Sequence, residues 1–121
     1  MVKVFLGGVG EESNWRDAII PRLNITYVNP VVSNESKDSC DFLLYVITPR
    51  MQGFSLIPEL IDTSNKKSNK TLFCAIFEEN EDMFTPHQKK SLDAIGKMIE
   101  NNGGRWLKSL DEVISFLNSY S

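Results

Sequence analysis

The chain has few of the residues that most often carry enzyme chemistry. Its 121 residues include one histidine, His87. This histidine follows Thr85-Pro86 in the first turn of a predicted helix, so a Ser-His-Asp or Cys-His site would need it to turn inward. No C-x-x-C, H-E-x-x-H or paired-histidine spacing occurs, which argues against a transition-metal site. We therefore expect neither histidine-based catalysis nor a metal, and no other cofactor.

The sequence also lacks a long apolar run and an excess of charge of one sign. No segment approaches the ~20 apolar residues of a membrane span. The first residues, MVKVFLGGVG, run into glycines without the features of a signal peptide. Thirteen Lys and Arg against sixteen Asp and Glu give a net charge of −3, which leaves no basic surface for nucleic acid or an anionic membrane. We expect a cytoplasmic protein with a small-molecule ligand.

The two cysteines do not indicate a disulfide. Cys40 and Cys74 are far apart in the sequence, and each lies at or inside an apolar segment. In a cytoplasmic chain this pattern favours buried, reduced thiols.

The length and the hydrophobic fraction of 41% predict one globular domain over residues 1–121. Five apolar segments indicate β-strands, at residues 2–6, 25–28, 42–47, 71–77 and 105–107. Helical patterns lie between them, at residues 15–22, from 56, from 86 to about 102 and from 110. Residues 31–39 and the acidic residues 78–82 are predicted loops.

This order of elements predicts an α/β fold with a five-stranded, mostly parallel, doubly wound sheet and helices on both faces. Segment 42–47 is apolar on both faces, as expected of its central strand. Ligands of such folds bind outside the carboxyl ends of the strands, where the winding reverses. That edge is predicted to carry Gly7-Gly8, Asn29-Pro30, Thr48–Gly53 and Phe77–Glu79.

The glycine-rich segment after the first strand has two interpretations. Gly7-Gly8-Val9-Gly10 contains neither G-x-G-x-x-G nor the lysine of a P-loop, so it is weak evidence for a dinucleotide or triphosphate site. It is compatible with a sugar or phosphate site, and equally with a plain tight turn.

Two carboxylates are candidates for chemistry. Glu59 is predicted in the first turn of a helix, where the macrodipole favours the ionised form that a nucleophile needs; it is otherwise a solvated first-turn glutamate. Asp41 begins the central strand, at the end opposite the expected cleft, where a capping or turn aspartate is the alternative. Trp15, Tyr27, Met51 and Phe54 are candidates for an apolar clamp on a flat base, or for core residues.

Several stretches of the sequence are similar to a known family. They are 4–8, 13–17, 27–30, 40–49 and 53–59, with shorter matches at 73–74, 90–92, 102–104 and 109–112. Together they resemble the nucleoside 2-deoxyribosyltransferase-like family, and within it a short branch found in bacteria and their phages. The resemblance covers nearly the whole chain.

The resemblance implies a flavodoxin-like sheet and a nucleophilic Glu59 that attacks the anomeric carbon of a 2′-deoxynucleoside or its monophosphate. A second base or water then resolves the glycosyl ester, so that the reaction is deoxyribosyl transfer or hydrolysis. Asp41 matches an aspartate that helps to shape the family's site. The family also implies a homo-oligomer, for which Phe116 and Tyr120 are candidate contacts. The substrate-binding residues that we expect are Gly7, Gly8, Ser13, Trp15, Asn29, Met51, Gly53 and Ser55.

The sequence departs from the family pattern at two positions. Phe5 stands where transferases usually have tyrosine, and Gly53 stands where they have an acid, so the proton donor to the leaving base is missing or supplied elsewhere. Related deoxynucleoside-monophosphate N-glycosidases have serine near that position, which suggests that Ser55 meets a 5′-phosphate. Two alternatives stay open: a non-catalytic nucleotide-binding module, and a TIR-like NAD glycohydrolase.

Overall fold

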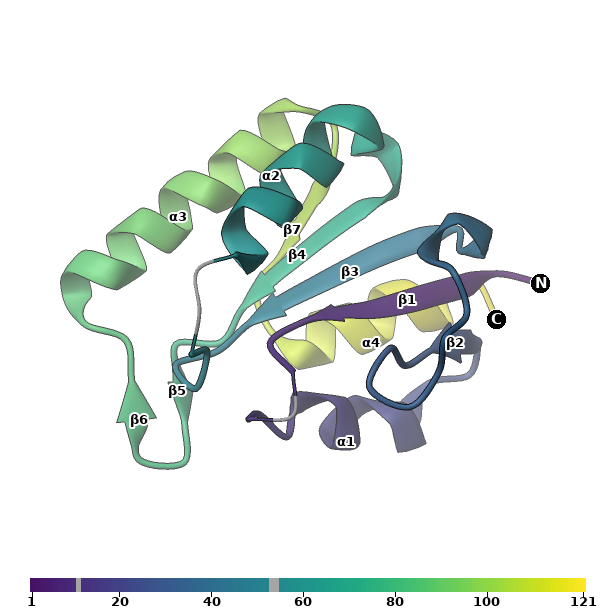
Figure 1. The fold of residues 1–121 in the computed structure, drawn as a ribbon, viewed down its shortest axis with the longest axis horizontal. Helices are drawn as coiled ribbons and strands as arrows, with labels where there is room; N and C mark the ends of the chain where they lie inside the picture. Colours follow the sequence, from purple (N-terminus) through teal and green to yellow (C-terminus); the bar gives the residue numbers. More distant parts are fainter. Residues whose placement is uncertain (11, 53–54) are drawn as a thin grey trace.

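The computed structural model describes residues 1–10, 12–52 and 55–121 (Figure 1). Its main sheet contains five strands, all parallel, in the order β2-β1-β3-β4-β7. These are β1 (Lys3–Gly8), β2 (Thr26–Val28), β3 (Phe42–Ile47), β4 (Thr71–Ala75) and β7 (Arg105–Leu107). The predicted doubly wound, flavodoxin-like α/β fold is therefore confirmed.

Helices cover both faces of the sheet (Figure 1). Residues of α1 (Trp15–Ile19) and α4 (Leu110–Asn118) pack with one core cluster, whereas residues of α2 (Leu56–Lys66) and α3 (Pro86–Asn101) pack with the other. The side chains of the central strands alternate between the two clusters: Leu44 and Val46 face the first, and Leu43, Tyr45 and Ile47 face the second. Because both faces are covered, β3 is apolar throughout. Short 3-10 turns occupy Ile20–Arg22, Lys37–Ser39 and Ser68–Lys70.

The predicted starts of α3 and α4 are confirmed. Thr85 and Gln88 form a reciprocal capping box at α3, with Pro86 at its first position, and the Ser109 hydroxyl accepts from the Glu112 N–H at α4. Such caps satisfy N–H groups that the first turn leaves without helical partners. No helix in the described part of the chain is both long and apolar enough to cross a bilayer.

The predicted acidic loop contains a short antiparallel hairpin, β5 (Glu78–Glu79) and β6 (Asp82–Met83). Asn80 adopts a φ of 57°, a left-handed conformation that asparagine tolerates better than most residues. Two-residue turns with such a residue favour hairpins. The predicted loop at residues 78–82 therefore contains strand residues that the sequence did not indicate.

The two cysteines are buried, and the C-terminal aromatic residues contact Phe42 of the same chain, although Tyr120 is 47% exposed. Cys40 and Cys74 are buried free thiols, as predicted, and burial raises the pKa of Cys74 to about 12, with a smaller contribution from Glu112.

The rings of Phe116 and Tyr120 pack edge-on against Phe42, with centroids 5.3 and 5.0 Å away. A homo-oligomer that uses these two aromatic residues stays a prediction.

Candidate functional site

The point where the winding reverses lies between β1 and β3. After β1 the chain passes to α1 on one face of the sheet, and after β3 it passes to α2 on the other. Such a divergence opens a crevice at the carboxyl ends of the strands. A cavity of about 230 Å³ occupies this place, which we call the glycine-loop cavity. It is lined by Gly8, Val9, Gly10, Glu12, Met51, Gln52, Ser55, Leu56 and Glu59.

Gly8 lets the chain approach β3 closely enough to form this cavity. Its φ of +112° is a conformation that residues with a side chain rarely adopt. A methyl group on Gly8 would lie 2.3 Å from the Val46 carbonyl oxygen and 2.4 Å from the Val46 nitrogen. The next residue, Val9, donates its N–H to that carbonyl at 2.8 Å. The glycine is thus required by the backbone, whatever ligand the cavity takes.

Two buried side chains of α1 hold the loop in place. Arg16 donates from Nε and Nη2 to the Leu6 carbonyl, at 3.0 and 2.7 Å, and from Nη1 to the Val9 carbonyl. Trp15 donates its indole N–H to the same Val9 oxygen at 2.8 Å. Burial lowers the pKa of Arg16 to about 10, and the nearby Glu12 carboxylate partly offsets this effect. The guanidinium therefore remains charged at neutral pH and satisfies carbonyls that the loop would leave unpaired.

Glu59 lies at the edge of the glycine-loop cavity. It occupies the first turn of α2, and its side chain is half exposed. Its Oε1 lies 3.5 Å from Lys37 Nζ. Partial burial lowers the pKa of Lys37, but the neighbouring Tyr45 and Glu59 more than offset that, so the pKa is raised overall. The Lys37 ammonium group and the amino-terminal end of α2 therefore both lie near this carboxylate.

A second carboxylate, Glu12, lines the same cavity. A methyl group on Gly10 would lie 3.3 Å from Glu12 Oε2, so this carboxylate is folded back over the glycine loop. Neither Glu12 nor Arg16 was among the site residues predicted from the sequence. The available signal was the Glu11-Glu12 pair directly after Gly10, at the predicted ligand-binding edge.

Met51 and Ser55, both predicted to bind the substrate, also line the glycine-loop cavity. Ser55 is the N-cap residue of α2, but its side chain makes no capping hydrogen bond. Gly53 and Phe54, named as a binding residue and a clamp residue, lie outside the described residues. The cavity thus combines a glycine loop, a serine at a helix start and two carboxylates.

Ser13 and Asn29 lie in a neighbouring cavity of about 170 Å³, which shares Gly10 with the first. The Ser13 hydroxyl lies 2.8 Å from Oε2 of Glu79, in the hairpin, and Glu79 also accepts the Asn14 N–H at 3.2 Å. Asn29 accepts the Val31 N–H through its side chain at 3.1 Å. Both predicted binding residues are therefore held by contacts within the chain, beside the glycine-loop cavity.

Four further predictions need correction. Asp41 precedes β3 at the amino edge of the sheet, the length of a strand away from the cavity, and it accepts the Lys3 N–H at 2.8 Å. We therefore assign Asp41 to strand pairing rather than to catalysis.

Trp15 is 1% exposed and belongs to the core, so it cannot clamp a base. A methyl group on Gly7 would face Leu44, Phe5 and Tyr45, and Gly7 does not line the cavity. Tyr27 is exposed on the edge strand β2 and is not part of this cavity.

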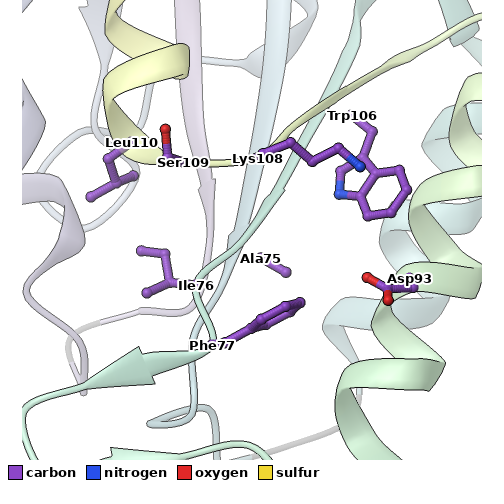
Figure 2. Close-up of a pocket in the computed structure, with 8 residues that line it drawn as sticks. All are labelled: Ala75, Ile76, Phe77, Asp93, Trp106, Lys108, Ser109 and Leu110. Carbon is purple, nitrogen blue, oxygen red and sulfur yellow. The ribbon is translucent and has the colours of Figure 1, made fainter.

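A second cavity, of about 350 Å³, lies at the carboxyl ends of β4 and β7 (Figure 2). We call it the β4–β7 cavity, and it shares no lining residue with the first. It is lined by Ala75, Ile76, Phe77, Asp93, Trp106, Lys108, Ser109 and Leu110. Sequence reasoning placed Phe77 at this edge of the sheet but missed Asp93, Trp106 and Lys108. These residues come from two distant segments, with no shared motif to connect them.

Within the described ranges, no group of three or more His, Cys, Asp or Glu residues is arranged to hold a metal ion. Comparison with family models, with curated proteins and with solved structures found no match. The resemblance to the deoxyribosyltransferase-like family therefore depends on the sequence stretches given above.

Proposed function

We propose that the chain is an N-glycosyl enzyme that cleaves or exchanges the base of a 2′-deoxynucleoside or of its monophosphate. One observation carries the proposal: Glu59 lines the cavity at the switch point of the sheet together with a second carboxylate, Glu12. Enzymes whose reactions pass through an oxocarbenium-like transition state commonly use two carboxylates, and such reactions need neither a metal nor a histidine. The sequence resemblance independently assigns the nucleophile to Glu59.

In the proposed reaction a Glu59 carboxylate oxygen attacks C1′ of the sugar. The bond between C1′ and the base nitrogen breaks, and its electron pair leaves with the base. Glu12, in its acid form, gives a proton to the departing base and becomes a carboxylate. It then takes a proton from the incoming water or second base, which attacks C1′ and releases Glu59. Glu12 thus supplies the proton donor that the family has at the position of Gly53.

The surroundings of Glu59 support a sugar, with or without a 5′-phosphate. The Ser55 hydroxyl and the first-turn N–H groups of α2 are suited to a phosphate, since a helix start favours negative charge. Met51 provides an apolar wall. A 2′-hydroxyl near such a wall is poorly solvated and also destabilises the oxocarbenium ion. Because an apolar wall alone rejects an added hydroxyl by only roughly 10²-fold, both effects have to act together.

We expect cleavage of deoxyadenosine or its 5′-monophosphate to exceed cleavage of adenosine or its 5′-monophosphate by more than roughly 10²-fold in kcat/KM. The four substrates and NAD are assayed side by side by chromatography of the released base. Equal cleavage of ribo and deoxy substrates, or a preference for NAD, would overturn the deoxyribosyl assignment in favour of a TIR-like activity. Binding of all five without turnover would indicate a non-catalytic module.

Glu12→Gln tests the proton donor. An amide of the same shape has no acidic proton, so cleavage should slow by roughly 10²-fold or more for a base that needs protonation to leave. A deoxynucleoside with a more acidic base, such as 5-fluorouracil, should lose much less, because its base leaves readily as an anion. Steady-state kcat for both substrates provides the comparison. An equal loss for both bases would show that Glu12 positions the loop instead of protonating the base.

A further inference from the structure

The β4–β7 cavity has a rigid aromatic wall. Trp106 lies directly on Gly96 of α3, because a methyl group on that glycine would be 2.3 Å from the indole ring. The Lys108 ammonium lies over the indole, with Nζ 2.9 Å from the ring centroid. Figure 2 shows the Phe77 ring entering the same space from the end of β4, with the Asp93 carboxylate beside it on α3. Two aromatic rings and two opposite charges therefore meet around one cavity.

Asp93 and the Trp106 indole N–H have no hydrogen-bond or ion-pair partner among the residues that the structure describes, and the exposed Lys108 ammonium contacts only the face of the Trp106 ring there. Neither Asp93 nor Lys108 takes part in any of the ion pairs there, which use other lysines and an arginine. Their carboxylate and ammonium make no side-chain hydrogen bond in this part of the chain, and the same holds for the Trp106 indole N–H. Asp93 only accepts hydrogen bonds, whereas Lys108 and the indole only donate them.

These groups define the chemistry of a ligand. It must present a flat face to Phe77, an N–H to Asp93, and acceptors to the indole and Lys108. A simple anion satisfies Lys108 but is repelled by Asp93. An amino acid carries its ammonium and carboxylate groups on one carbon. To bind both, a protein needs an acidic and a basic side chain that lie close enough to form an ion pair with each other. Asp93 and Lys108 do not form such a pair, so a ligand whose donor and anion are separated fits better.

We propose that the β4–β7 cavity is a second ligand site, which binds an aminopurine mononucleotide. The exocyclic amino group donates to Asp93, a ring nitrogen accepts from Trp106, and the phosphate pairs with Lys108, while the base lies against Phe77. The volume of about 350 Å³ is within the range of small-molecule sites. This site is separate from the glycine-loop cavity and does not depend on the function proposed there.

The two tryptophans of the chain allow the two cavities to be observed separately. The Trp15 indole N–H binds the carbonyl of Val9, which lines the glycine-loop cavity, and the Trp106 indole lines the β4–β7 cavity. Adenosine 5′-monophosphate is titrated into the ¹⁵N-labelled full chain, and the two indole resonances are followed by NMR. We expect the Trp106 resonance to shift saturably. A Glu59→Ala background prevents turnover during the titration and leaves this result unchanged.

Variants then identify the contacts. Asp93→Asn and Lys108→Met should each raise the Kd from the Trp106 titration by about ten-fold, the usual scale for a charge-assisted hydrogen bond. Lys66→Met, at an exposed lysine of α2 that does not line this cavity, should leave it unchanged. An unshifted Trp15 resonance in each free variant shows that the fold is intact.

Four results would overturn the second site. A shift of Trp15 alone would mean that the nucleotide binds only in the glycine-loop cavity. Equal affinity for inorganic phosphate would reduce the site to a lysine that attracts anions, and equal affinity for phenylalanine would favour an amino acid. Unchanged affinity of both Asp93→Asn and Lys108→Met would show that the ligand does not make the proposed contacts with these side chains. Loss of glycosyl activity in the enzyme assays would leave the Trp106 titration unaffected, so the two proposals fail separately.

Discussion

Glu59→Ala should lower kcat for base release by about 10³-fold or more, with little change in the free energy of unfolding. Loss of a nucleophile removes a covalent step that no neighbouring group replaces. The stability cost is small, because Glu59 makes one ion pair at 3.5 Å between side chains that are 36% and 50% exposed, and such pairs contribute at most about 1 kcal/mol. Turnover of deoxyadenosine and urea unfolding, measured on the same preparation, test both statements.

Asp62→Ala is the matched control. Asp62 lies on the same helix, is exposed and pairs with Lys66 at 3.1 Å, but it does not line the cavity. It should keep the wild-type rate. A slow deoxynucleoside analogue adds a direct test, since the intact protein should gain the mass of one deoxyribosyl group and Glu59→Ala should not. Comparable turnover of Glu59→Ala and the wild type would show that Glu59 is not the nucleophile.

Local patterns predicted most of the fold because strong local signals agreed with the tertiary arrangement. The continuous apolar segment 42–47 has to be covered on both faces, and it became the central strand β3. Thr85-Pro86 and Ser109 fixed the starts of two helices through hydrogen bonds within a few residues. The hairpin at 78–83 was missed because its strands contain only two residues each, too few for an alternation to be recognised.

The candidate site was less predictable, because its contacts connect distant residues. Arg16 was overlooked because α1 contains only five residues, too few to show that a charged side chain turns inward to the Leu6 and Val9 carbonyls. Asp41 was included on its match to the family, although its place before a parallel strand puts it at the opposite edge. Glu59 follows β3 and lines the cavity, whereas Asp41 directly precedes β3 and does not. A carboxylate therefore reaches the ligand-binding edge only if it lies at the carboxyl end of the strand, however close to the strand it is in the sequence.

Gly8→Ala should have the largest effect on stability. Two separate costs act at this residue: the φ of +112° is unfavourable for alanine, and the new methyl group would overlap the Val46 backbone at 2.3 and 2.4 Å. Each effect costs roughly 1–3 kcal/mol in proteins, so the free energy of unfolding should fall by about 2–6 kcal/mol. A change of about 3 kcal/mol corresponds to a fall in Tm of roughly 10 °C for a domain of this size. Thermal unfolding followed by circular dichroism provides the measurement.

Two other glycines separate the two costs. Gly103 has a similar φ of +103°, but a methyl group there would meet only the Ser68 side chain at 3.4 Å, an ordinary contact. Gly103→Ala should therefore show the conformational cost alone. Gly10 has no positive φ, and its added methyl group would meet only the flexible Glu12 carboxylate at 3.3 Å, so Gly10→Ala should change stability by less than about 0.5 kcal/mol. If Gly8→Ala is no less stable than Gly103→Ala, the close approach of the loop to β3 is absent. The cavity that brings Glu12 and Glu59 together would then lose its structural basis, because the Val9 N–H could no longer be fixed on the Val46 carbonyl.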